Sequence, residues 1–165
     1  MIKQLLTKVA LLTAVLLLSS CSSEESDSPV LASNIVTTYN YNSSETEMAR
    51  IINEYRVSIG LNALQTINHI SYKSDEHNQY MIERKVVNHD LFDQRSRNLI
   101  AVLGAVKVNE NVAYNYSTPA AAMHAWLESP MHRTNIEGDF THFGIAITTD
   151  VETGKKYFTN IFIKK

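Results

Sequence analysis

Three side chains that lie far apart in the sequence, His89, Glu110 and His132, are of the types that bind metal ions. Neutral imidazole nitrogen and carboxylate oxygen both suit zinc and other divalent cations, and three such ligands leave a fourth position for water. A site of this kind can activate water for hydrolysis, and it can equally act as a clamp for a ligand. We predict that the three side chains meet in one divalent-metal site.

A second kind of chemistry is suggested by Ser129, which lies three residues before His132. A serine beside a histidine can be a nucleophile with its base. Ser129, however, precedes Pro130 in a turn that is expected to end a helix, where a serine is better suited to capping. Glu128 is the nearest acid, and we treat Glu128 and Ser129 as possible additional residues of the cleft.

The three predicted ligands also allow a structural interpretation. They could form a buried hydrogen-bonded network that joins three loops to a sheet, because such networks can specify a unique fold. The remaining histidines in the folded region carry weaker signals. His77 falls on the apolar face of an expected helix and is expected to be a packed core residue, whereas His69 and His124 are expected at the surface.

The start of the chain has the layout of a secretory signal. Lys3 and Lys8 come first, and an apolar run and Leu-Ser-Ser then lead to Cys21. The apolar run is about ten residues long, which is short of the roughly 20 residues that a membrane-spanning helix needs. We therefore predict a signal peptide over residues 1–20.

Cys21 is the only cysteine of the chain, and its position after Leu-Ser-Ser resembles the bacterial lipobox. The resemblance implies cleavage before Cys21 and its lipidation, which would anchor the protein to a bacterial membrane outside the cytoplasm. An ordinary signal that ends near a cysteine is the alternative. Residues 21–43 would then be the lipidated cysteine and a polar, acidic tether. The acidic start of the tether resembles signals for the outer membrane or cell surface, but its charge would also simply extend a linker.

The length and charge of the remainder restrict the class of protein. Residues 44–165 are enough for one domain with one core. The chain has 15 basic and 17 acidic residues, a formal net charge of −2. No basic face emerges that could neutralise a run of phosphates, so we expect no nucleic-acid partner.

The elements that must position these side chains follow from periodicity and end signals. Ser44-Glu45-Thr46-Glu47 fits a capping box, so a helix is expected from there to Gly60. The further elements expected are a helix over 67–84, a loop over 86–97 that carries His89, one or two helical turns over 98–106, a short strand near 109–115, a helix from Thr118 to Ser129, and a β-hairpin over 143–163. This order predicts an α+β fold with helices packed on a small antiparallel sheet.

Several motifs, taken together and in order, resemble the bacterial CAP (SCP-like) domain. They are Tyr55-Arg56 with Gly60-Leu61-Asn62-Ala63-Leu64, Met81 followed by His89, Glu110-Asn111-Val112-Ala113, Trp126-x-x-Ser129-Pro130-x-His132-Arg133-x-Asn135-Ile136, Phe143-Gly144-Ile145-Ala146 and Tyr157-Phe158-Thr159-Asn160-Ile161-Phe162. The resemblance covers roughly Ser44 to Ile163.

This resemblance implies an α-β-α sandwich with a cleft in which His89, Glu110 and His132 converge and in which some relatives hold zinc or another divalent cation. Three departures are visible. Met131 stands where the bacterial pattern usually has glycine, Ser129 stands at the second acidic position of eukaryotic relatives, and Asn160 replaces the usual glutamine.

Two functions from different classes follow. One is a membrane-anchored extracytoplasmic binding module whose cleft takes a metal ion and a small lipid, a peptide-like ligand or a protein partner. The other is a metal-assisted hydrolase. The first is favoured, because no nucleophile has an identifiable base and the family that the chain resembles has no agreed reaction.

Overall fold

The computed structural model describes residues 35–165. The predicted signal peptide, Cys21 and the tether as far as residue 34 lie outside the described residues. Within the described part, none of the helices combines the length and apolar character needed to cross a membrane.

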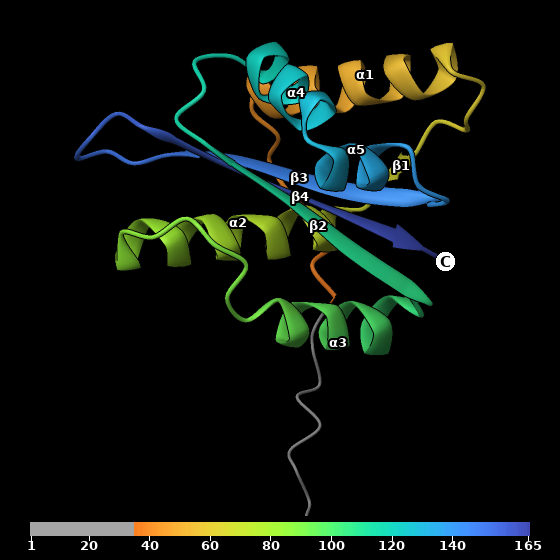
Figure 1. Cartoon of the computed structure of the whole chain (residues 1–165). Helices are drawn as coiled ribbons and strands as arrows, with labels where there is room; N and C mark the ends of the chain where they lie inside the picture. Colours follow the sequence, from red (N-terminus) through yellow and green to blue (C-terminus); the bar gives the residue numbers. More distant parts are fainter. Residues whose placement is uncertain (1–34) are drawn as a thin grey trace, which may run out of the picture. The chain divides into compact units, whose positions relative to one another are not determined.

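The elements follow one another as α1 (Ser43–Ser58), β1 (Gln65–Thr66), α2 (Asn68–Arg84), α3 (Phe92–Leu103), β2 (Lys107–Tyr114), α4 (Pro119–Glu128), α5 (Pro130–Ile136), β3 (His142–Thr149) and β4 (Lys156–Lys164). The sheet has the strand order β1-β3-β4-β2, and only the two-residue β1 pairs in parallel. Helices α1, α4 and α5 cover one face, and α2 and α3 cover the other (Figure 1). The α+β sandwich that the sequence predicted is confirmed.

Strand β4 shows how the sheet divides the core. Phe158 and Phe162 point to the α1–α4 face, where they pack with Trp126 and Ile52. Ile161 and its neighbours at every second position point to the other face, toward α2 and α3. Because β4 is central and buried on both faces, it reads as a continuous apolar run interrupted by Thr159 and Asn160.

Helix α1 begins at a different cap from the one predicted. Asn42 is the N-cap, and its side chain and that of Glu45 form the reciprocal bonds of a capping box. Glu45 is buried and also accepts hydrogen bonds from the Ile147 backbone and the Tyr39 hydroxyl. The predicted Ser44–Glu47 box is therefore wrong by two residues, because the acid in the correct box also serves the sheet.

Two predictions about chain breaks need correction. The polar stretch after Leu91 is not loop: α3 begins at Phe92 and continues to Leu103, where Gly104 adopts a left-handed conformation. Pro130 does end α4, but it also supplies the first residue of α5. The short helix α5 was not predicted, because a proline that stops one helix is equally suited to start the next.

The segment before α1 lies against the beginning of α2. The Val36 backbone donates to Nδ1 of His69 at 3.1 Å, and the Asn68 side chain donates to the Thr37 carbonyl at 2.7 Å. The Tyr41 hydroxyl also bonds to Ser71 at 2.9 Å. These contacts cover His69, which is buried and not at the surface as predicted.

Candidate functional site

Glu110 is the centre of the candidate site. It lies on β2 and points to the α2–α3 side of the sheet, where its side chain is 1% exposed. The Arg95 guanidinium donates from Nε to Oε2 at 2.9 Å and from Nη2 to Oε1 at 2.8 Å. Nδ1 of His89 lies 2.8 Å from the same Oε1. Both carboxylate oxygens are therefore occupied by protein donors.

Arg95 is a site residue that the sequence reasoning missed. Its side chain is 8% exposed, and Nη1 donates to the Asp90 carbonyl at 2.8 Å, so the guanidinium is fixed on two sides. Arg95 shares the buried stripe of α3 with Leu99 and Leu103. Arg95 stands four residues before Leu99, a spacing that would place both on one face of a helix and could have indicated that Arg95 is buried. The signal was missed because the stretch was predicted to be a loop.

His89 lies in the loop between α2 and α3, as predicted, and its side chain is 52% exposed. Lys85 and Leu91 bound this loop, and both adopt left-handed backbone conformations with φ of 55° and 60°. The Asp90 carboxylate receives hydrogen bonds from Asn88 and from the Tyr80 hydroxyl, each at 2.9 Å. Non-glycine residues at positive φ cost energy and persist only where the surroundings fix them. The loop therefore has a definite shape.

His77 completes the buried side of the cluster. Its Nε2 lies 2.9 Å from the Asn88 carbonyl, to which it donates, and 3.7 Å from Oε1 of Glu110. Nδ1 is buried and has no hydrogen-bond partner among the described residues. Burial lowers the pKa of His77, and the charge of Glu110 opposes this shift without cancelling it. The imidazole is thus held neutral at pH 7.

His132 approaches from the opposite face of the sheet. It lies on α5, where the Asn111 side chain donates to its carbonyl at 3.0 Å and its Nδ1 lies 2.8 Å from the Ser129 hydroxyl. Burial lowers the pKa of His132, and the nearby His89 lowers it further. Ser129 does occupy the cap position between α4 and α5, but its side chain makes no cap bond and contacts His132 instead.

The edge position of β2 explains how side chains from two faces come together. Glu110 and Asn111 are consecutive and point to opposite faces, and no strand lies beyond β2 in the sheet. Asn135 of α5 reaches over this edge and donates to the Glu110 carbonyl at 3.2 Å and to Asn111 Oδ1 at 2.7 Å. A hollow of about 290 Å³ follows the edge and is lined by His89, Phe92, Val108, Asn109, Glu110 and Asn135.

The two cleft histidines share one feature. Nδ1 of each is hydrogen-bonded, to Glu110 in His89 and to Ser129 in His132, and no protein group in residues 35–165 bonds to either Nε2. No carboxylate bonds to His132 in that range, so Ser129 and His132 lack the third member of a catalytic triad. No group of three or more His, Cys, Asp or Glu side chains in the described residues is arranged to hold a metal ion.

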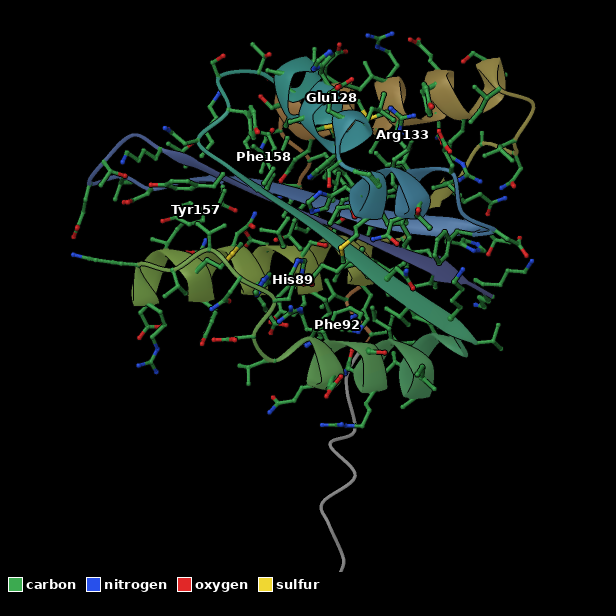
Figure 2. All side chains as sticks on the ribbon, in the orientation of Figure 1. His89, Phe92, Glu128, Arg133, Tyr157 and Phe158 are labelled. Atoms are coloured by element: carbon green, nitrogen blue, oxygen red, sulfur yellow. The ribbon has the colours of Figure 1, made fainter. Side chains whose placement is uncertain are left out.

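Glu128 does not join the cluster. It is exposed at the end of α4 and makes no hydrogen bond or ion pair with another described residue. Figure 2 shows Glu128 and Arg133 on the α4–α5 side of the sheet, and His89 and Phe92 on the α2–α3 side. Of the two additional residues considered, only Ser129 contacts a cleft histidine.

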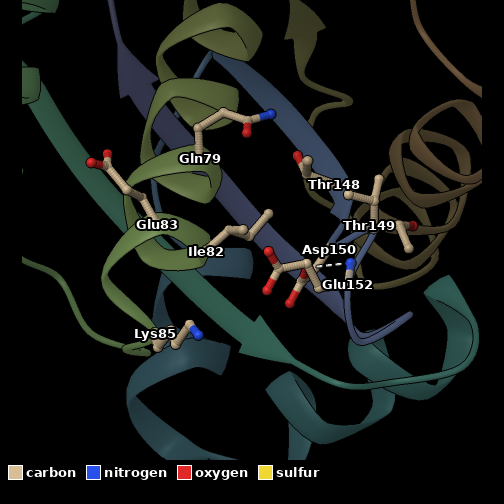
Figure 3. A pocket seen from close by; sticks show the side chains of 9 residues that line it. Gln79, Ile82, Glu83, Lys85, Thr148, Thr149, Asp150 and Glu152 are labelled. Atoms are coloured by element: carbon tan, nitrogen blue, oxygen red, sulfur yellow. Dashed lines mark hydrogen bonds between the residues drawn. The ribbon is translucent and has the colours of Figure 1, made fainter.

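A second hollow, of about 450 Å³, lies between the end of α2 and the β3–β4 turn (Figure 3). It is lined by Gln79, Ile82, Glu83, Lys85, Thr148, Thr149, Asp150, Val151 and Glu152. Asp150 is committed to the turn, because it accepts hydrogen bonds from the Glu152 backbone and the Thr153 hydroxyl. No histidine lines this hollow, so it is separate from the cluster around Glu110.

Comparison with known proteins decides the family. Residues 49–162 match the model of the cysteine-rich secretory protein family, CAP. This chain is a CAP-family protein. It is also 30% identical over 129 residues to the uncharacterized membrane protein YlbC of Bacillus subtilis, a match that covers 74% of this chain and 35% of that protein. The chain thus spans about a third of the length of this relative.

Solved structures agree with the CAP assignment. An outer surface protein from Borrelia burgdorferi superposes with a TM-score of 0.69 at 19% identity, over 77% of this chain and 96% of that one. An extracellular protein with an SCP domain from Bacillus anthracis gives 0.64 at 22% identity, over 78% of this chain and 45% of that one. At these identities the superpositions establish the fold.

The departures from the CAP pattern can now be placed. Met131 is 81% exposed beside His132, so the extra side chain projects into solvent and does not crowd the turn. Asn160 is fully buried in β4, and neither polar atom of its side chain has a partner among the described residues. Both differences lie close to α5 or on the sheet face that α5 covers.

We expect the free energy of unfolding of this CAP domain to fall as the pH is lowered from about 7 to 5. The pKa values of His77 and His132 are lowered in the fold, so the unfolded chain, with histidine pKa values of about 6.5, binds protons first. The stability that this contributes is present above about pH 6.5 and is lost on acidification. Urea denaturation at several pH values measures the slope.

Histidine variants provide the controls for this pH series. His77→Gln should give a shallower slope, and His124→Gln, at an exposed position, should keep the wild-type slope. The Glu110 carboxylate contributes to the pH dependence of stability at lower pH than the histidines do. Burial opposes its charge, but bonds from His89 and Arg95 outweigh burial and lower its pKa, so its contribution is lost below about pH 4. Equal slopes for wild type and His77→Gln would show that protonation of His77 does not contribute to the pH dependence of stability.

Proposed function

We propose that this protein is a membrane-anchored extracytoplasmic binding module whose CAP cleft takes a divalent metal ion, Zn²⁺ or a similar cation, through His89 and His132. The observation that carries the proposal is the shared state of the two imidazoles. Each has Nδ1 hydrogen-bonded to a neighbour, and no group among residues 35–165 bonds to either Nε2. The position of β2 at the edge of the sheet supports their meeting, because Glu110 contacts His89 and the next residue, Asn111, binds the carbonyl of His132.

The donor set fits a metal with one change to the predicted roles. Metal-binding histidines commonly donate their other ring N–H to a carboxylate, which fixes the tautomer and the ring. Glu110 stands in this relation to His89, and Ser129 stands in a similar relation to His132. We therefore propose His89 and His132 as ligands, with Glu110 acting behind His89 in place of its predicted role as a direct ligand.

A two-histidine site leaves several coordination positions for other groups. When bound, the ion would supply an electrophilic centre for the carboxylate, phosphate or carbonyl oxygen of a ligand. Val87, Leu91 and Met131 are exposed apolar side chains close in sequence to the two histidines. These side chains support a ligand with an apolar part, such as a small lipid or a peptide-like molecule.

The extracytoplasmic location rests on separate support. The similar solved structures include an outer surface protein and an extracellular protein, and the relative from Bacillus subtilis is named as a membrane protein. The lipobox-like sequence before Cys21 would direct lipidation of this cysteine and so attach the protein to the bilayer. The acidic start of residues 21–43 suits the outer membrane or cell surface.

Calorimetric titration of the purified, metal-free protein with Zn²⁺ tests the proposal. We expect saturable binding, and we expect His89→Ala and His132→Ala each to weaken it by about 100-fold or more, since each removes one of two protein ligands. His124→Ala is the matched control, because His124 is exposed on α4 and should leave binding unchanged.

The alternative to this function is a structural network, and the Arg95–Glu110–His89 bonds are the observation that favours it. In that case the protein would give no heat with Zn²⁺. His89→Ala would then lower the melting temperature without changing any binding. Together these two results would show that the cluster stabilises the fold and does not bind a metal ion.

A further inference from the structure

We infer that at least one internal water molecule binds between Asn160 of β4 and Asn111 of β2, beneath helix α5. The inference does not depend on metal binding in the cleft. Asn160 is fully buried, and neither its Oδ1 nor its Nδ2 has a hydrogen-bond partner among residues 35–165. A buried amide without partners is unfavourable, because both polar atoms lose their bonds to bulk water on folding. The side chain therefore marks a place where a small polar molecule binds.

The direction of the Asn160 side chain follows from its neighbours on β4. Phe158 and Phe162 lie two residues before and after it, and they belong to the same core cluster as Ile136 of α5. Side chains at every second position of a strand share one face of the sheet. Asn160 therefore points to the face that α4 and α5 cover.

Asn111 is the polar side chain beside Asn160 in the sheet. In the strand register Asn160 is paired with Asn111 on β2 and with the apolar Ile145 on β3. Directly opposite residues of antiparallel strands have β-carbons about 4.5–5.5 Å apart. No hydrogen bond joins the two amides, although they are neighbours. A water molecule between them would bond to both.

Asn111 keeps hydrogen-bonding capacity for this water. Its Oδ1 accepts from Asn135 at 2.7 Å, and its Nδ2 donates to the His132 carbonyl at 3.0 Å. An asparagine amide has two hydrogens on nitrogen and two lone pairs on oxygen, so one of each remains. Water both donates and accepts, and it can link the spare groups of Asn111 to Asn160. Buried polar groups of this kind are the usual partners of internal water.

The length of the Asn160 side chain agrees with a bound water. The CAP pattern usually has glutamine at this position, and glutamine is longer by one methylene group. In a close-packed core, a side chain that is shorter by this amount can be compensated by one small polar molecule. The water would extend to β4 a network in which Asn109 and Asn111 of β2 already bind Asn135 of α5.

Magnetic relaxation dispersion of the water nuclei counts the long-lived internal waters of the purified protein and tests the inference. Globular proteins hold about one buried water per 27 residues, so the difference between variants is the decisive quantity. We expect Asn160→Leu, which removes both polar atoms at similar size, to lose at least one long-lived water. Asn40→Leu, at an exposed position before α1, is the control and should keep the wild-type number.

Nuclear Overhauser effects locate the water in the wild-type protein without any substitution. We expect cross-peaks between water and the side-chain amide protons of both Asn160 and Asn111. If Asn160→Leu does not fold, Asn160→Gln takes its place in the count. Its amide lies one methylene group further out, so it should reach Asn111 directly and displace the water.

Either of two results would overturn the inference. One is an equal number of long-lived waters in wild type and in the folded Asn160 variant. The other is the absence of water cross-peaks at the Asn160 amide of wild type, which would show that this side chain is buried without any partner. Zinc titration is a separate measurement, so both results leave the proposed function as it stands.

Discussion

Gly144→Ala is expected to destabilise the protein by about 3 kcal/mol, because a β-carbon at this position has no room. It would lie 2.3 Å from the Ser71 backbone nitrogen and 2.5 Å from the carbonyl carbon and β-carbon of Ile70. Most of these atoms belong to the backbone of α2, so no side-chain rotation relieves the overlap. Thermal unfolding should show a melting temperature about 10 °C lower.

The close approach at Gly144 is reinforced by hydrogen bonds that a shift of α2 would break. The Ser71 hydroxyl accepts from the Ile145 backbone at 3.0 Å, and the Ser74 hydroxyl donates to the Gly144 carbonyl at 3.2 Å. Gly154→Ala is the control, since a β-carbon there meets nothing within 4 Å and only the positive φ of 70° is unfavourable. It should cost about 1 kcal/mol. Similar losses for both variants would show that backbone conformation, and not crowding, determines the effect.

Arg56→Met is expected to cost about 4 kcal/mol, because it removes the donors for several buried acceptors that no other group can serve. The fully buried guanidinium donates to the carbonyls of Ile136 at 2.6 Å, Gly138 at 3.0 Å and Asn62 at 2.9 Å. Burial lowers the pKa of Arg56, which shows that the charge itself is disfavoured there. The unpaired backbone carbonyls nevertheless outweigh the relief of removing the charge, since they remain in the variant.

Urea denaturation measures this loss of stability, and two further variants separate the effect of the lost charge from that of the lost donors. Arg56→Lys keeps the charge but not the planar array of donors, so an intermediate loss of about 2 kcal/mol is expected. Arg50→Met on the same helix removes an arginine that makes only exposed ion pairs, and it should change little. If Arg56→Met were as stable as wild type, the ends of α1 and α5 would not depend on this side chain.

Arg56 also connects stability with the candidate site. It binds the C-terminal carbonyl of α5, the helix whose first turn carries His132. Loss of Arg56 should therefore weaken the proposed zinc binding as well as stability.

Local sequence rules predicted the elements whose ends depend on their own residues. Thr118 caps α4 through its side chain, Pro119 occupies the first turn, and the β3–β4 hairpin turns at Gly154, all as expected. The family motifs located the cleft residues His89 and Glu110, which do contact each other.

The rest depended on partners that are distant in the sequence. The polar stretch around Arg95 is helical because Glu110, 15 residues later, receives the guanidinium in the interior. His69 is buried because residues that precede α1 fold back over it. The capping box forms at Asn42 and Glu45 and not two residues later, because the backbone N–H of Ile147 also donates to the buried Glu45 carboxylate. None of these partners can be recognised from a local pattern.

The candidate site shows the same limit. Sequence patterns identified His89, Glu110 and His132, but not that an arginine pairs with both oxygens of the glutamate. They placed Ser129 at a helix cap but did not show that its hydroxyl contacts His132, because the short helix α5 was not predicted. Motif matching identified His89 and Glu110, which contact each other, and only the structure shows which of their atoms are already hydrogen-bonded.

The way the chain enters the domain has a mechanical consequence. Val36 is bonded to His69, and the other ring nitrogen of His69 lies 2.9 Å from Oδ1 of Asn98, one turn along α3 from Arg95. Tension applied to the chain at residue 35 would thus act first on the few hydrogen bonds that join residues 36–41 to the start of α2. The same bonds join the segment before α1 to the helix that carries Arg95, so a force applied to this segment would reach Glu110 through α3.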